Sequence, residues 1–374
     1  MSFDAMNLKP KLLDGIFGHG FEKPSAIQDQ AIVPITTGKD VICQAQSGTG
    51  KTATFSIACL QRIDENLKKT QAIILAPTRE LAQQSADVLT SIGSKMNIVV
   101  QCIIGGSTVQ QDIESLNRNV PHVVVGTPGR LNQLITQGNL HCENVKMVIV
   151  DEADEMLKTD FQDQIISVFK AVSQGTQLVM VSATMPQQIL DLTSSFMPDA
   201  IQILVKEDEL TLDGIRQYQV ALDNSWKTST LFDIFKVMTV QQCIIFSNNQ
   251  SVVVEVYEAL KHENFACDMI HGKMDQAERN AVMKSFRLGT QRVLIATNVI
   301  ARGIDVQNVS LVINYDIPKR PEQYLHRIGR SGRFGRKGVA INLVSEQDTA
   351  NLQIIQDTYQ TTIELLPAEL QSLI

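Results

Sequence analysis

Short apolar runs alternate with helical patterns along almost the whole chain. Parallel strands that are buried on both faces read as continuous apolar runs, and helices crossing one face of the sheet connect them. The alternation therefore predicts an α/β fold of mostly parallel sheets with helices on both faces. The runs that predict strands are 40–45, 72–76, 98–104, 123–125, 147–150, 177–181, 201–205, 217–221, 243–246, 269–270, 292–296, 311–314 and 339–344.

A charged segment at 206–213, which has no strand pattern, interrupts this alternation near the middle of the chain. A chain of 374 residues is also too long for one ordinary hydrophobic core. We predict two similar α/β domains, residues 1–205 and 214–374, joined by a short linker at 206–213. Residues 345–374 are expected to form a terminal helix and tail without a chemical role.

Composition and charge narrow the classes of protein that the chain can belong to. A net charge of −7 argues against coating nucleic acid through bulk charge, but it allows a local basic groove. No apolar run is long enough for a membrane span and no signal peptide precedes the first domain, so no membrane association is expected. The six cysteines are scattered without a Cys-x-x-Cys pair, which predicts reduced thiols in an intracellular protein.

The predicted strand at 147–150 ends on three carboxylates, Asp151, Glu152 and Asp154. Open parallel sheets bind their ligands at the carboxyl ends of the strands. Carboxylates at such a place need a cation, because burial of unpaired charge is costly. The alternative is an acidic first turn of the following helix, where Asp and Glu are favoured.

The predicted strand at 40–45 leads directly into a P-loop, Gln46-Ser47-Gly48-Thr49-Gly50-Lys51-Thr52, in its strand–loop–helix context. Backbone N–H groups of 48–52 and the helix N-terminus can cradle phosphates. Lys51 is expected to reach the β- and γ-phosphates, and the Thr52 hydroxyl to bind Mg²⁺. The alternative is a glycine-rich connecting turn, but Lys51 and Thr52 would serve no packing need there.

Together the two motifs predict nucleotide hydrolysis, with Asp151 as a Mg²⁺ ligand and Glu152 orienting or deprotonating water. The second half of the chain has no P-loop, so its expected use is to close on the site of the first. Arg330 and Arg333 lie three apart in a glycine-rich basic segment and fit arginine fingers. The alternative for these arginines is a phosphate-backbone contact or a surface ion pair, and we prefer one of these for Arg327 and Arg336.

These residues are part of a longer set that resembles the DEAD-box RNA helicases over almost the full chain. The set includes a Q-motif-like segment at 20–28 with Phe3 upstream, a helicase-type P-loop at 45–52, and the name-giving segment at 151–154. The other matching segments are 77–81, 105–106, 127–130, 182–184, 276–279, 301–305 and 326–333. The resemblance implies two RecA-like domains and an RNA-stimulated ATPase that uses ATP and Mg²⁺.

Within the family, the chain is most similar to the initiation factor 4A subfamily. This implies a monomeric, cytoplasmic helicase that binds RNA without sequence specificity and unwinds short duplexes by domain closure in translation initiation. It also implies RNA and a MIF4G-type protein scaffold as partners. A nuclear RNA clamp of the exon-junction type and a ribosome-assembly helicase remain alternatives. The Q motif and the RNA-facing segments argue against a DNA translocase.

The resemblance also implies a role for each matching residue. Gln28 would read adenine with Phe3 stacked on it, and Asp305 would touch the ribose. The phosphates and Mg²⁺ would be held by Ser47, Gly48, Thr49, Gly50, Lys51, Thr52 and Asp151. An RNA path along phosphates and 2′-hydroxyls would be lined by Pro77, Thr78, Arg79, Gly106, Thr127, Arg130, Gln276, Arg279 and Thr297. Coupling to the closed state would use Asp154, Ser182 and Thr184.

Three positions depart from the family pattern. Lys273 and Asn298 stand where Asp is usual, and Asn249 stands where Thr is more common. Two of these changes remove a negative charge near the expected RNA path. They are expected to tighten RNA binding or to disturb local hydrogen bonds, and to leave the nucleotide-binding positions untouched.

Overall fold

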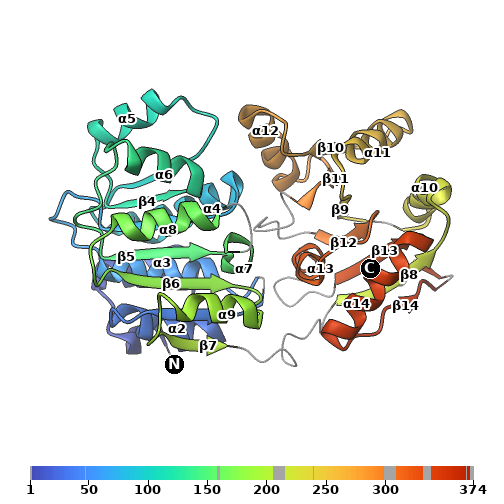
Figure 1. The fold of residues 1–374 in the computed structure, drawn as a ribbon. Helices are drawn as coiled ribbons and strands as arrows, with labels where there is room; N and C mark the ends of the chain where they lie inside the picture. The colour runs from blue at the N-terminus through green and yellow to red at the C-terminus, as the bar shows by residue number, and fades with distance from the viewer. Residues whose placement is uncertain are drawn as a thin grey trace. The chain divides into compact units, whose positions relative to one another are not determined.

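The computed structural model describes residues 2–46, 48–157, 161–204, 215–238, 240–298, 309–331, 338–367 and 369–370. The chain forms two compact units, Met1–Val205 and Lys206–Ile374 (Figure 1). The predicted linker at 206–213 lies outside the described residues.

The first unit is built on one parallel sheet with the strand order β3-β4-β2-β5-β6-β1-β7. Its strands are β1 (Val41–Gln44), β2 (Ala72–Leu75), β3 (Val100–Ile103), β4 (Val123–Gly126), β5 (Met147–Asp151), β6 (Gln177–Ser182) and β7 (Ile201–Leu204). The inner strands are buried at every position, whereas the edge strands β3 and β7 are partly exposed. Continuous apolar runs therefore correspond to strands covered on both faces.

Helices cover both faces of this sheet (Figure 1). They are α1 (Pro10–Gly18), α2 (Ala26–Thr36), α3 (Lys51–Arg62), α4 (Arg79–Ile92), α5 (Val109–Arg118), α6 (Pro128–Thr136), α7 (Ala153–Met156), α8 (Gln162–Ala171) and α9 (Gln187–Ser194). Alternate strand residues enter different cores, because successive side chains point to opposite faces. Ile74 and Ile149 share one core with residues of α1 to α4. Ile73 and Val148 share the other with residues of α5, α6, α8 and α9.

The second unit repeats this strand order position by position, as β10-β11-β9-β12-β13-β8-β14. Its strands are β8 (Ile215–Ala221), β9 (Gln242–Phe246), β10 (Cys267–Ile270), β11 (Val293–Ala296), β12 (Val309–Asn314), β13 (Gly338–Val344) and β14 (Glu364–Leu365). Residues of α12 (Gln276–Arg287), α13 (Pro321–Ile328) and α14 (Thr349–Tyr359) share a core on one face, and residues of α10 (Lys227–Val237) and α11 (Gln250–His262) on the other. Thus β8 takes the place of β1, and β12 the place of β5.

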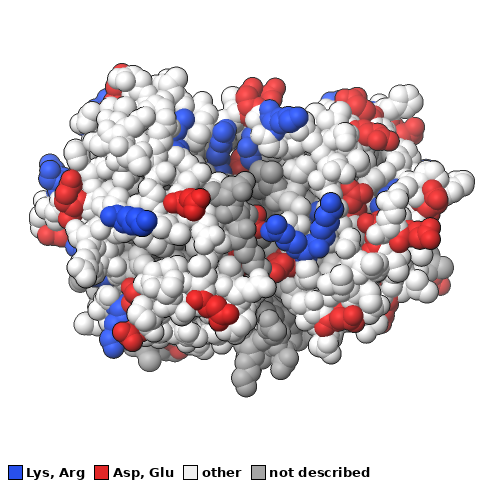
Figure 2. All heavy atoms as spheres, in the orientation of Figure 1, with Lys and Arg blue, Asp and Glu red and all other residues white. Residues whose placement is uncertain are grey.

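The predicted α/β class with two domains is confirmed, and each predicted strand is found within a few residues of its expected bounds. Among the strands in the described part of the chain, β14 alone lacked a sequence signal, because its two residues are exposed and form no apolar run. The six cysteines are all free thiols. In the ranges that the structure describes, no helix has both the length and the apolarity that crossing a bilayer requires. On the face drawn in Figure 2, acidic and basic side chains are interspersed.

Candidate functional site

The candidate site residues of the first unit lie at the carboxyl edge of its sheet, in two adjacent groups. Residues predicted to hold the phosphates and Mg²⁺ follow β1 or end β5, and the predicted coupling residues Ser182 and Thr184 end or follow β6; these three strands are neighbours in the strand order. Residues predicted to line the RNA path follow β2, β3 and β4, which form the other half of the order. The two groups meet where β2 lies beside β5.

The P-loop connects β1 to α3, and Lys51 is the first residue of that helix. The Lys51 amine is buried and donates to the carbonyls of Ala45 at 2.7 Å and Gln46 at 2.9 Å, so it lies over the loop. Gly50 caps the helix with a φ of 94°, a conformation that L side chains rarely adopt. Ser47 lies outside the described residues.

The Q-motif residue Gln28 packs directly against the P-loop. Ser25 caps α2, and its N–H donates to Gln28 Oε1 at 2.8 Å while Gln28 N–H donates to Ser25 Oγ at 3.4 Å. This capping box fixes the Gln28 amide. A Cβ at Gly50 would lie only 2.6 Å from Gln28 Nε2, so the approach requires glycine. Ser25, which holds Gln28 in place, was not among the predicted site residues, although the Ser-x-x-Gln spacing is typical of a capping box.

The carboxylates that follow β5 are buried and electrostatically coupled. Burial, followed by the charge of Glu152, raises the pKa of Asp151 to about 7, while Lys51 opposes this shift. Glu152 N–H donates to Asp151 Oδ1 at 3.0 Å. Glu152 itself has a φ of 52° and begins α7, so its backbone is held in a sparsely populated conformation.

This donor set fits Mg²⁺. The cation prefers oxygen ligands such as the Asp151 carboxylate and the Thr52 hydroxyl. A buried carboxylate whose pKa is raised by burial and a second acid is stabilised in its charged form when a cation binds.

Asp154 faces β6 instead of the P-loop. Its Oδ1 accepts a hydrogen bond from Ser182 Oγ at 2.6 Å, and its Oδ2 accepts one from Thr184 Oγ1 at 2.7 Å. All three residues are buried. Ser182 also accepts from the Ala45 N–H through its carbonyl at 3.1 Å, which joins this cluster to the start of the P-loop.

Phe3 lies in the hydrophobic core of the first unit with no exposed surface. Its ring packs edge-on against Phe17, with 6.4 Å between centroids. The Phe3 ring therefore has no open face in this arrangement, and stacking on an adenine requires the N-terminal segment to move.

The RNA-facing group is assembled around the turn at 105–107. Thr78 caps α4 by accepting from Leu81 N–H at 3.2 Å, and Thr127 precedes α6. A Cβ at Gly105 would lie 3.0 Å from a terminal nitrogen of Arg79. Gly106 has a φ of 117°.

Arg130 is committed to contacts within the unit. Its guanidinium pairs with the Asp112 carboxylate and donates to the Ser107 carbonyl at 2.9 Å. Arg130 therefore supports the 105–107 turn through the Ser107 carbonyl. Its partner Asp112 was not singled out by the sequence.

The expected RNA residues of the second unit lie at the ends of β10 and β11. Gln276 begins α12, and Arg279 is buried one turn later. Burial, followed by the charges of Arg279 and Lys273, lowers the pKa of His271, while the charge of Glu278 opposes this shift. The Thr297 hydroxyl has no hydrogen-bond partner among the described residues.

The two residues predicted as arginine fingers can be placed only in part. Arg330 follows α13, is buried, and donates from Nε to the His326 carbonyl at 3.0 Å. Arg333, Arg336 and Asp305, which was predicted to touch the ribose, lie outside the described residues. The surface or phosphate role preferred for Arg327 is wrong, because its guanidinium is fully buried among amide and carbonyl oxygens.

Comparison with known protein families shows the family of this chain. The family model described as DEAD/DEAH box helicase matches residues 25–192, and the family model described as helicase conserved C-terminal domain matches residues 226–335. The chain belongs to the DEAD-box helicase family. All the predicted site residues except Phe3 lie within the two matched segments.

Individual relatives of this DEAD-box helicase match it over nearly its whole length. The ATP-dependent RNA helicase eIF4A of Scheffersomyces stipitis is 54% identical over 99% of this chain and 94% of the relative. Eukaryotic initiation factor 4A of Caenorhabditis elegans is 53% identical over 100% of this chain and 93% of the relative. The structure of Saccharomyces cerevisiae Dbp5 bound to RNA and ADP BeF3 has a TM-score of 0.92 and 36% identity, covering 98% of this chain and 95% of that one.

Proposed function

We propose that this DEAD-box helicase is an RNA-stimulated ATPase that binds RNA without sequence specificity and opens short duplexes by ATP-driven closure of its two units. One observation carries the proposal: the nucleotide group and the RNA group of the first unit occupy adjacent halves of one sheet edge. A structural change at the nucleotide group can therefore alter the adjacent RNA group. The eIF4A relatives, and a Dbp5 structure that contains RNA and ADP BeF3, support the same substrates.

The residues at the nucleotide would share the work as follows. Gln28, fixed by Ser25 against the P-loop, would read the adenine, and Asp305 would contact the ribose. The phosphates would be held by Ser47, Gly48, Thr49, Gly50 and Lys51. Mg²⁺, held by Thr52 and Asp151, would supply positive charge to the β- and γ-phosphates. Phe3 would stack on the adenine only after leaving its contact with Phe17.

Phosphoryl transfer depends almost entirely on positioning and electrostatic stabilisation. Glu152 would orient the attacking water, from a backbone held in its left-handed conformation. Arg330 and Arg333 would add positive charge at the γ-phosphoryl group when the two units close on ATP and RNA. Loss of one arginine finger is expected to lower turnover by about 10³-fold or more. Asp154, Ser182 and Thr184 would tie the nucleotide group to this closure.

RNA would be held mainly through its phosphates and 2′-hydroxyls. In the first unit, Pro77, Thr78, Arg79, Gly106 and Thr127 would form the contact surface, with Arg130 supporting the turn beneath it. In the second unit, the contacts would come from Gln276, Arg279 and Thr297. The bend of RNA held by both units would separate a short duplex.

The initiation-factor relatives support a role in translation initiation. In that role the protein would act as a cytoplasmic monomer that a MIF4G-type scaffold recruits. A nuclear RNA clamp and a ribosome-assembly helicase have the same site chemistry. Affinity purification from the native cell distinguishes them: recovery of a translation-initiation scaffold supports the first assignment, and recovery of a splicing-linked core or of pre-ribosomes overturns it.

The central experiment is the Glu152→Gln variant. It keeps the size of the side chain and removes the carboxylate, so ATP and RNA should still bind while turnover is lost. Binding is measured with a fluorescent ATP analogue and a labelled single-stranded RNA, and turnover by phosphate release. RNA-stimulated turnover near the wild-type rate in this variant would contradict the role proposed for Glu152.

A further inference from the structure

A buried guanidinium connects the carboxyl ends of three adjacent strands in the second unit. Arg327 lies on α13 with no exposed surface. Its Nε donates to Asn298 Oδ1 at 2.7 Å, and one terminal nitrogen donates to Asn248 Oδ1 at 2.6 Å. The other donates to Asn314 Oδ1 at 3.1 Å and to the Asp316 carbonyl at 2.7 Å. These acceptors follow or end β11, β9 and β12, which are adjacent in the sheet.

The acceptors named above for Arg327 are all uncharged oxygens. Burial lowers the pKa of Arg327 to about 9, although the nearby charge of Asp316 opposes the shift. The guanidinium carbon also lies 5.4 Å from the centroid of the Phe246 ring. A buried cation held by dipoles depends on the position of each dipole. Displacement of one amide therefore changes how firmly the guanidinium is held.

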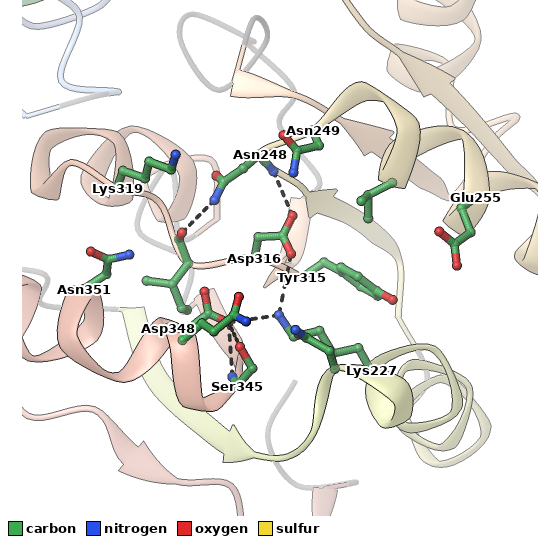
Figure 3. A pocket seen from close by; sticks show the side chains of 14 residues that line it. Lys227, Asn248, Asn249, Glu255, Tyr315, Asp316, Lys319, Ser345, Asp348 and Asn351 are labelled. Atoms are coloured by element: carbon green, nitrogen blue, oxygen red, sulfur yellow. Dashed lines mark hydrogen bonds and ion pairs between the residues drawn. The ribbon is translucent and has the colours of Figure 1, made fainter.

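Asp316 holds the loop after β9 from a second side (Figure 3). Its Oδ2 accepts from the Ser247 hydroxyl at 2.5 Å and from the Asn248 N–H at 3.0 Å. Its Oδ1 pairs with the buried Lys227 amine at 3.5 Å, and that amine pairs with Asp348 at 3.0 Å. A pocket of about 440 Å³ opens beside these residues, so this side of the loop lacks packing. The loop position therefore depends on these hydrogen bonds.

Arg327 lies between two functional segments. On one side, its partner Asn298 directly follows Thr297, which belongs to the proposed RNA path. On the other side, Arg330 comes three residues after Arg327 and donates its N–H to the Arg327 carbonyl at 3.2 Å. One side chain therefore contacts a residue next to the RNA path, while its backbone supports the turn that carries an arginine finger.

We propose that Arg327 is a positioning residue that transmits RNA binding to Arg330 through the amide of Asn298. RNA held at Thr297 fixes the backbone at 297–298 and with it the Asn298 oxygen. This oxygen fixes the guanidinium, and the turn behind α13 then presents Arg330 in one position. The inference rests on the proposed function, because it requires RNA at Thr297 and the nucleotide at Arg330.

Two variants of matched chemistry test the proposal in the full-length protein. Asn298→Ala and Asn314→Ala each remove one amide acceptor from the same guanidinium, but only Asn298 adjoins the RNA path. We measure the ratio of RNA-saturated to RNA-free ATP turnover per folded molecule. In Asn298→Ala the ratio should fall about tenfold, an ordinary size for coupling between sites. Asn314→Ala should lower the thermal midpoint and keep the ratio.

A rescue variant and the wild type make the result decisive. Asn298→Asp restores an oxygen acceptor at the same position and should restore most of the ratio. An unchanged ratio in Asn298→Ala, or an equal fall in Asn314→Ala, overturns the proposal. If the wild type itself shows no RNA-stimulated turnover, the proposed function fails, which is a different outcome from failure of the coupling.

Discussion

The Asp154 carboxylate and the Ser182 hydroxyl are joined by a 2.6 Å hydrogen bond, which connects α7, the helix after β5, to the end of the adjacent strand β6. Both groups are buried, and Thr184 supplies a second donor to the same carboxylate. The third acid of the name-giving motif is thus held by hydroxyl groups, whereas Asp151 and Glu152 are the acids that we propose to act at the nucleotide. Substitutions around Asp154 should therefore have different effects from substitutions of Asp151 or Glu152.

Ser182→Ala should lower the free energy of unfolding by about 1–3 kcal/mol, because the buried Asp154 loses a charge-assisted hydrogen bond. Duplex unwinding per ATP hydrolysed should fall more than ATP binding does. Ser56→Ala is a matched control, since Ser56 is equally buried and its hydroxyl has no partner among the described residues. Equal destabilisation of both variants in chemical denaturation would refute the importance of the Asp154 contact.

Asp151→Asn should stabilise the protein in the absence of Mg²⁺ while abolishing turnover. The folded pKa of Asp151 is raised from 3.8 to about 7, so the folded state binds the proton more tightly than the unfolded state. Stability therefore falls as the pH rises from about 4 to about 7, and the full cost remains above that window. A pKa difference of one between the folded and unfolded states corresponds to about 1.4 kcal/mol, so the variant should gain roughly 1–4 kcal/mol at neutral pH. Denaturation with a chelator at several pH values checks this; a gain that is independent of pH would contradict it.

Gly50→Ala should weaken ATP binding strongly. A Cβ there would meet Gln28 Nε2 at 2.6 Å, in a backbone conformation with a φ of 94°. Gly175→Ala separates the two causes, because Gly175 has a φ of 89° and no atom near its Cβ position. The control should lose about 1–2 kcal/mol of stability and keep its ATP affinity. Similar ATP affinities in the two variants would show that the contact with Gln28 has no effect.

Arg130→Gln and Asp112→Asn should weaken RNA binding by similar factors, because the pair supports the 105–107 turn. Filter binding at several salt concentrations distinguishes this support from a direct phosphate contact. For a direct contact, Arg130→Gln would lower the slope of log affinity against log salt by about one, and Asp112→Asn would tighten binding. For the supporting role, both variants should keep the wild-type slope.

Much of the fold follows from local patterns, because each buried parallel strand is a continuous apolar run and each turn signal lies beside it. The P-loop and the carboxylates after β5 are also local, so the nucleotide group can be found without coordinates. Contacts between segments that only the order of the strands brings together cannot be found in this way. Asp112 and Arg130 lie on separate helices, and the acceptors of Arg327 come from three strand ends. No spacing in the sequence reveals such partners.

The burial of Phe3 could likewise not be predicted from the sequence, since an upstream aromatic residue can stack on a ligand or pack in the protein core. The edge strand β14 shows the same limit in the fold. It has two exposed residues, and it exists only because β8 offers it a free edge to pair with.

The strand order also determines when each unit can finish folding during synthesis. The strand that carries the P-loop, β1, pairs with β6 and β7, which are the last strands of its unit to be made. A nascent chain must therefore expose residue 204 outside the ribosome before this sheet is complete. In the second unit β8 is synthesised first, and it likewise cannot pair until β13 and β14 have been synthesised. Pairing between such distant segments is slow, so β1 and β8 are the segments that stay longest without partners on a growing chain.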